Sequence, residues 1–405
     1  MPQRKSVPTL RHSVILCIGK NFDLVCYGCR DYSQINLLLD SDMYCDLSTP
    51  LDTLPASLLE DMYSVICRRK CGPQYLHVLI QPQIRHIVIQ PGTIHFALSF
   101  LQQRCQRLQS LDLTGSTHMN PELFIPVFKH FPNLVTLNLC DNVIDDRSFN
   151  NIGITCHSLR HLNVGRSTIS DLGLQFLSRS QQNVGRCQML ETINLDKCRV
   201  TRKGVASFIF YHPSLRNLVY EDTVGALFEL QKLGCGAEDG FLFNISLLTA
   251  ESEQDPVDDE LRSAVMMNPA VTGVRLLSTK LSNSGLYSLM NCKSLTYLNI
   301  TNTDLFRVDF DEGIMPVLTE CGHNLETLIL DRFKHVDIGS VGKLCPKMKK
   351  LSLSHIVHFS QLLVPCEVKM FMINKVVTSC FRISSICWRI LVWRISMAAA
   401  LSPTY

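Results

Sequence analysis

Four cysteines in the first part of the chain have a spacing that could bind a metal. Cys26 and Cys29 are separated as in half of a zinc site, and Cys67 and Cys71 could supply the other half. Zinc prefers ligands in tight pairs, whereas three residues separate the second pair. We therefore expect these thiols to belong to a capping segment, and we expect neither a metal nor another cofactor.

The sequence contains none of the motifs of common catalytic sites. It has no phosphate-binding loop with its lysine, no dinucleotide fingerprint, no nucleophile elbow and no His-Glu-x-x-His pair. The histidines are scattered, and no cysteine has a matched base in the sequence. We therefore expect a protein that is not an enzyme.

A short pattern repeats along the middle of the chain. Apolar residues stand at its first, fourth and sixth positions, as in Leu134-Val-Thr-Leu137-Asn-Leu139. The first positions of the eleven copies are Ile84, Leu108, Leu134, Leu159, Leu190, Leu215, Leu242, Val271, Leu295, Leu325 and Met348. Successive copies begin 23 to 31 residues apart, close to the period of about 20–29 residues that is typical of leucine-rich repeats.

This pattern predicts a strand followed by a helix. The fourth and sixth positions have the spacing of a strand with one buried face, and a helix-like stretch follows in most copies. We therefore predict an α/β fold, a right-handed leucine-rich-repeat solenoid with a curved parallel sheet and outer helices, preceded by a small helical segment. The predicted boundaries are 1–82 for the helical adaptor-binding or capping segment, 83–362 for the solenoid and 363–405 for an atypical tail.

Five cysteines occupy one position of the repeat, three residues before its first apolar residue. They are Cys105, Cys156, Cys187, Cys292 and Cys345. This placement resembles the cysteine-containing subclass of leucine-rich repeats found in F-box and related ubiquitin-ligase receptors, and the resemblance implies small buried thiols. The repeat phase of the cysteines, and the lack of a signal peptide, favour a reduced cytoplasmic or nuclear protein over a secreted one.

An amphipathic stretch near the start of the chain predicts a helix. Leu10, Val14, Cys17 and Ile18 fall on one face of it, and Thr9 suits its beginning. The stretch resembles the elongin-binding box that opens the Zyg and Zer family of leucine-rich-repeat ubiquitin-ligase receptors, because Thr9 and Leu10 match the first positions of that box. Val14 stands where the family has its cysteine. The resemblance implies that the apolar face binds an elongin adaptor.

A second amphipathic stretch begins near Leu54 and Pro55 and continues through Leu58. It resembles the segment that meets the cullin in the Zyg and Zer family, and also the Leu-Pro opening of an F-box, which would bind a Skp-type adaptor instead. The choice between the two adaptors stays open here. Another interpretation needs no adaptor, because both helices could simply cap the open end of the solenoid.

The residues between the apolar strand positions, with their neighbours, would line the concave face of the sheet. We expect this face to bind a protein target through Asp112, Asn138, His161, Asn163, Asn194, Glu221, Tyr297, Asn299, Ile329 and Asp331. Tyr297 and Ile329 would be the anchors. The repeated asparagines would also be explained by a solvated sheet face without a partner.

Composition argues against other classes of partner. The net charge is only +3, and no basic stripe with interleaved aromatic residues is present, so we do not expect nucleic-acid binding. Residues 380–401 are apolar, but arginines interrupt them, so we do not expect a membrane span.

The resemblances to the Zyg and Zer family and to F-box receptors imply the substrate-recognition subunit of a cullin-RING ubiquitin ligase. Residues 9–82 would dock an elongin or Skp-type adaptor with its cullin, and the repeats would hold the target protein. The alternative is a non-enzymatic interaction scaffold or inhibitor with no link to a ligase, whose first 82 residues only cap the solenoid. The identity of the substrate stays open.

Overall fold

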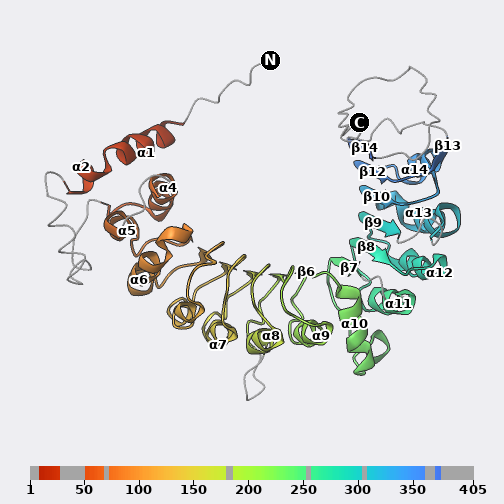
Figure 1. Cartoon of the computed structure of the whole chain (residues 1–405), viewed down its shortest axis with the longest axis horizontal. Helices are drawn as coiled ribbons and strands as arrows, with labels where there is room; N and C mark the ends of the chain where they lie inside the picture. The colour runs from red at the N-terminus through yellow and green to blue at the C-terminus, as the bar shows by residue number, and fades with distance from the viewer. Residues whose placement is uncertain are drawn as a thin grey trace, which may run out of the picture. The chain divides into compact units, whose positions relative to one another are not determined.

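The computed structural model describes residues 9–27, 51–67, 73–178, 186–251, 257–302, 308–360 and 370–374. The chain divides into two compact units, Met1–Gly204 and Val205–Tyr405, which are described separately. The division falls within helix α9, Arg202–Tyr211. In each unit, most strands are followed along the chain by a helical segment (Figure 1).

The first unit begins with a helical segment. It consists of α1 (Leu10–Lys20), α2 (Phe22–Tyr27), α4 (Ala56–Ile66) and α5 (Pro73–Leu79). Thr9 caps α1 by accepting a hydrogen bond from the backbone N–H of His12 at 3.3 Å, in agreement with the prediction. The Arg11 guanidinium joins α1 to α4, because it lies 2.8 Å from the Ser57 carbonyl oxygen and 2.7 Å from the Asp61 carboxylate.

The first unit continues with one strand in each repeat. The strands are β1 (His86–Val88), β2 (Ser110–Asp112), β3 (Thr136–Asn138), β4 (His161–Asn163) and β5 (Thr192–Asn194). Each pairs in parallel with the next, and the fourth positions of the repeat are in register, from Ile87 opposite Leu111 to Leu162 opposite Ile193. These apolar residues are buried. Each strand therefore pairs with the equivalent strand of the next repeat in the sequence.

Helical segments follow these strands, and Figure 1 shows them on one side of the sheet. They are the 3₁₀ helix η2 (Pro91–Thr93), α6 (Ile94–Arg104), the 3₁₀ helices η3 (Pro121–Phe124) and η4 (Phe128–His130), α7 (Asp146–Thr155) and α8 (Asp171–Ser178). Their buried residues include Leu98, Phe124, Phe149 and Leu174. The core of this unit therefore lies between the sheet and the helices.

The second unit repeats this plan. Its strands are β6 (Asn217–Val219), β7 (Leu247–Glu251), β8 (Gly273–Thr279), β9 (Tyr297–Asn302), β10 (Thr327–Asp331), β11 (His335–Asp337), β12 (Lys350–Ser354), β13 (His358–Ser360) and β14 (Met370–Asn374). Its helical segments are α10 (Thr223–Lys232), η5 (Ala237–Asp239), α11 (Asp258–Met267), α12 (Asn283–Leu286), η6 (Tyr287–Asn291), η7 (Phe310–Ile314), α13 (Met315–Cys321), η8 (Gly322–Asn324) and α14 (Ile338–Leu344). A parallel sheet has the order β7, β8, β9, β10, β12 and β14, and β11 pairs separately with β13. The fold is that of an α/β leucine-rich-repeat solenoid, as the sequence predicts.

One copy of the repeat was placed three residues too early in the sequence. Leu242, its predicted first position, is 61% exposed, whereas Ile245 is 1% exposed. The register pairs Leu248 with Val274 and Ala250 with Leu276, so the copy begins at Ile245. The prediction was wrong because Leu242 imitates the first apolar position, while alanine at the sixth position gives a weak apolar signal.

The sheet of the second unit extends past residue 362, where the sequence analysis ended the repeats. β14 pairs in parallel with β12, with Phe371 opposite Leu351 and Ile373 opposite Leu353. The segment Val368-Lys-Met-Phe371-Met-Ile373 has the repeat pattern and begins 20 residues after Met348. This twelfth copy was therefore visible in the sequence.

A polar contact recurs where helices of neighbouring repeats begin. The Asp146 carboxylate accepts hydrogen bonds from the backbone N–H and the hydroxyl of Ser170, at 3.1 and 2.5 Å. Asp171 binds Thr201, and Asp258 binds Ser282, in the same way. A glycine follows each hydroxyl residue by three positions: Gly173, Gly204 and Gly285. A Cβ atom at these glycines would lie only 2.1 to 2.5 Å from the carboxylate oxygen, so the close approach requires glycine.

Candidate functional site

Helix α1 has an apolar face that is open to solvent. Leu10 is 82% exposed and Val14 is 48% exposed. Cys17 is exposed as well, and Ile18 is half-buried. A different face of α1 carries Ile15, which is buried. The helix is therefore anchored along one side, while the residues predicted to bind an adaptor lie on or beside its free side.

The second predicted adaptor segment lies at the start of α4. Pro55 is exposed at the N-cap of this helix, and Leu54 and Leu58 are half-buried. The bond from Arg11 to the Ser57 carbonyl places α1 against this same turn of α4. The structure thus brings the two segments that were predicted to bind an adaptor together.

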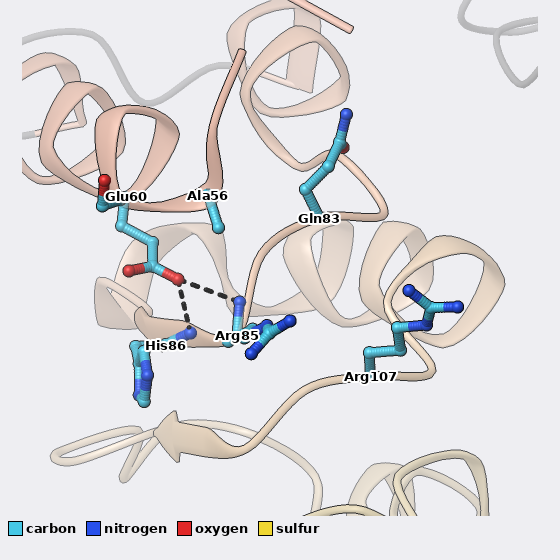
Figure 2. A pocket seen from close by; sticks show the side chains of 7 residues that line it. Ala56, Glu60, Gln83, Arg85, His86 and Arg107 are labelled. Carbon is cyan, nitrogen blue, oxygen red and sulfur yellow. Dashed lines mark hydrogen bonds between the residues drawn. The ribbon is translucent and has the colours of Figure 1, made fainter. Parts of the chain in front are cut away.

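Glu60, which the sequence analysis did not single out, closes the open edge of the first sheet. In the next repeat, the backbone N–H groups of Gln109 and Ser110 share the Arg85 carbonyl oxygen, each at 2.8 Å. No strand precedes β1 among the described residues, and the equivalent N–H groups of Arg85 and His86 both donate to Glu60 Oε1 at 2.9 Å (Figure 2). The carboxylate therefore takes the place that a carbonyl oxygen of a preceding repeat would have, and its charge strengthens both bonds.

The predicted sheet-face residues of the first unit form a row along the strands. The register aligns Asp112, Asn138, Asn163 and Asn194 on β2 to β5. Each uses a side-chain oxygen to accept a hydrogen bond from the backbone N–H two residues later, at 2.9 to 3.1 Å. This local bond turns the chain at the end of each strand and explains why asparagine recurs at this position. His161, at a different position of β4, is exposed.

The remaining sheet-face residues belong to the second unit. Glu221 is exposed and lies two residues after the end of β6. Tyr297 and Asn299 lie on β9, and the register places Asn299 opposite Ile329 of β10. These three residues are half-buried, and Asn299 Nδ2 donates to Tyr297 Oη at 3.3 Å. Asp331 also has a partner within the protein, because its carboxylate lies 2.7 Å from His355 Nδ1.

The structure describes only part of the possible zinc site. Cys29 and Cys71 lie outside the described residues, and Cys67 is buried. Within the described ranges, no group of three or more histidine, cysteine, aspartate or glutamate side chains could hold a metal ion. Among all the residues that the structure describes, no helix is long and apolar enough to cross a membrane.

The repeat cysteines are buried in both units. Cys105, Cys156, Cys187, Cys292 and Cys345 are each 1% exposed or less. The Cys105 thiol donates to the Gln81 carbonyl at 3.3 Å and the Cys156 thiol to the Phe131 carbonyl at 3.5 Å, which links neighbouring repeats. Burial raises the pKa of all five thiols to about 12.

This burial predicts a difference in alkylation. The thiolate is the reactive species, and a thiol with a pKa near 12 holds almost no thiolate at pH 8. We expect iodoacetamide to modify the exposed Cys17 in the native protein, while Cys156 and Cys187 react only after denaturation. Mass spectrometry of the alkylated peptides measures this. Native modification of Cys156 as fast as that of Cys17 would contradict the packing described.

Comparison with known proteins finds similarity among solved structures. No model of a protein family matches the sequence, and a search of curated proteins finds no match. Among solved structures, an internalin from Listeria monocytogenes is similar to the chain, with a TM-score of 0.44 and 13% sequence identity. The similarity covers 74% of this chain and 82% of the internalin chain. The fold assignment rests on the strand register and the buried repeat positions of the protein itself.

Proposed function

We propose that this chain is the substrate-recognition subunit of a cullin-RING ubiquitin ligase in the cytoplasm or nucleus. The helical segment would dock an elongin or Skp-type adaptor together with its cullin, and the sheet face of the repeats would bind the target protein. The chain itself would catalyse no reaction. The observation that carries the proposal is the exposed apolar face of α1.

The exposure of this face is best explained by a partner. Leu10 and Val14 are one helical turn apart, so they point to the same side of a helix that is already anchored on α4. Burying one such side chain contributes roughly 1.5–3 kcal/mol. Spaced apolar residues on one helix face are the usual way in which a helix binds a groove of a partner. Because α1 is held in place, it would pay little ordering entropy on binding.

A scaffold or inhibitor without a ligase link is the second candidate. It is supported by Glu60, because this residue of the helical segment accepts hydrogen bonds from the backbone N–H groups of Arg85 and His86 at the edge of β1. Capping and adaptor binding would depend on different side chains, since Glu60 of α4 contacts β1 while the exposed apolar face belongs to α1. A test must therefore change the face of α1 and leave the cap intact.

Point variants are better suited to this test than a truncation. Removal of residues 1–82 would take away Glu60 and the buried Leu59 and Met62, and would damage the repeats as well. We would instead purify the full chain and a Leu10→Asp/Val14→Asp variant from cells and identify the bound subunits by mass spectrometry. The matched control is Leu172→Asp on α8, since Leu172 is an apolar helix residue that is 49% exposed, close to the 48% of Val14.

We expect elongin and cullin subunits, or a Skp-type adaptor with its cullin, to be recovered with the full chain and with Leu172→Asp. Recovery should fall about tenfold or more with the double variant, because both anchors of the interface become charged. Val14→Cys restores the cysteine of the elongin-binding box and should increase recovery of elongin only. Equal recovery of other partners by all variants, with no adaptor in any sample, would refute the receptor proposal and leave the scaffold.

A further inference from the structure

A shallow pocket lies where the helical segment meets the first repeats. It has a volume of about 410 Å³, within the range of roughly 300–1,000 Å³ that is usual for ligand pockets. The residues that line it are Ala56, Ser57, Glu60, Gln83, Arg85, His86 and Arg107 (Figure 2). All of them belong to the first unit. Two arginines and a histidine face one hollow with a single acidic residue.

The two arginines differ from most other arginines of this unit. Arg11, Arg147, Arg160 and Arg166 each form an ion pair with a carboxylate. Arg104 and Arg186 donate to backbone carbonyls or an amide side chain. Arg85 and Arg107 are exposed, and neither has an ion pair with any described residue. Their guanidinium groups therefore remain available for a ligand.

The acidic residue of the pocket is already engaged elsewhere. Glu60 Oε1 accepts the backbone N–H groups of Arg85 and His86, so this carboxylate is committed to the edge of β1. In Figure 2 the Arg85 side chain extends away from the Glu60 carboxylate, toward the side of the pocket where Arg107 stands. The Glu60 carboxylate therefore forms no ion pair with either arginine of the pocket.

We propose that this pocket binds an oxyanionic side chain of a peptide segment, with Arg85 and Arg107 as the residues that contact the anion. A planar guanidinium presents paired N–H donors that fit a carboxylate or a phosphate. Ser57, an exposed residue that also lines the pocket, offers a neutral hydroxyl group to the peptide beside the anion. That the peptide belongs to a target protein rests on the proposed function, whereas the preference for an anion rests on the pocket itself.

The test uses three pools of nine-residue fluorescent peptides. Each pool has flanks randomised among alanine, glycine and serine, and the central residue is phosphoserine, glutamate or glutamine. Binding to the full-length protein is measured by fluorescence polarisation at about 0.15 M ionic strength, so that weak long-range attraction is screened. The variants are Arg85→Ala and Arg107→Ala. The control is Arg199→Ala, because Arg199 is another exposed arginine of this unit without an ion pair among the described residues.

We expect an anionic pool to bind at least about tenfold more tightly than the glutamine pool. Each pocket variant should remove that preference, while Arg199→Ala keeps it. If the phosphoserine pool binds more tightly than the glutamate pool, the ligand is a phosphorylated segment. If the two anionic pools bind equally, the ligand is an acidic segment. Equal binding of all three pools, no binding at all, or the same loss with Arg199→Ala would refute the proposal. Adaptor recovery with Arg85→Ala and Arg107→Ala should stay normal, so failure of this site and failure of the ligase assignment can be told apart.

Discussion

Replacement of Glu60 by alanine is expected to lower the free energy of unfolding of the protein by about 1–3 kcal/mol. The variant loses the acceptor of two backbone hydrogen bonds, from Arg85 and His86, each 2.9 Å long. These two amides then have only water as an acceptor at the edge of β1. Repeat proteins are stabilised by contacts between neighbours, so a weakened first strand also weakens the repeat that follows.

Urea denaturation and amide hydrogen exchange together check this prediction. The denaturation midpoint should fall, and exchange should become faster at Arg85 and His86 before it does so at β4. The control is Glu122→Ala, because the Glu122 carboxylate is exposed and, among the described residues, its ion pair is with the exposed Arg147, at 3.4 Å. An unchanged midpoint together with unchanged protection of the two amides would show that Glu60 does not act as the cap.

Replacement of Gly173 by alanine is expected to destabilise the protein by about 1–3 kcal/mol, the usual range for overpacking. The new Cβ would lie 2.5 Å from Asp146 Oδ1 and 2.6 Å from Ile169 Cγ1. The carboxylate cannot move aside freely, since it binds the backbone N–H and the hydroxyl of Ser170. This cost exceeds the stabilisation of up to about 1 kcal/mol that is normally gained when alanine replaces glycine in a helix.

The matched control for this substitution is Gly92→Ala. A Cβ at Gly92 would meet nothing within 4 Å, so alanine there should be neutral or slightly stabilising, because it restricts the unfolded chain. Thermal unfolding of the two variants beside the wild type provides the comparison. If Gly173→Ala unfolds at the same temperature as Gly92→Ala, the contact between Asp146, Ser170 and Gly173 does not hold neighbouring repeats together.

The repeat period could be predicted from the sequence because most copies carry three large apolar residues, as Leu134, Leu137 and Leu139 do. The copy that begins at Ile245 could not be placed correctly, since Ala250 occupies its sixth position. In that copy the burial of Ile245 and the strand pairing of Leu248 with Val274 reveal the register. Local periodicity therefore predicts a repeat well where every core position is large, and fails where one is small.

The candidate site was less accessible to sequence reasoning than the fold. The apolar stripe of α1 indicates a helix, but whether Leu10 faces the core or solvent depends on how α1 packs on α4. Glu60 carries no signal at all, because a glutamate on an amphipathic helix resembles a solvated surface residue. The row from Asp112 to Asn194 was interpreted as a recognition surface, and only the structure adds the turn-forming bond of each side chain.

The bonds of Glu60 also bear on self-association. The exposed edge of a β-sheet offers free N–H and C=O groups, on which a second chain can add a strand and begin an aggregate. At β1, the N–H groups of Arg85 and His86 are already bonded to a carboxylate. A second copy would have to displace that charge and leave it without its partners before it could pair there. The residue that completes the sheet within one molecule therefore also protects it from growing into a filament.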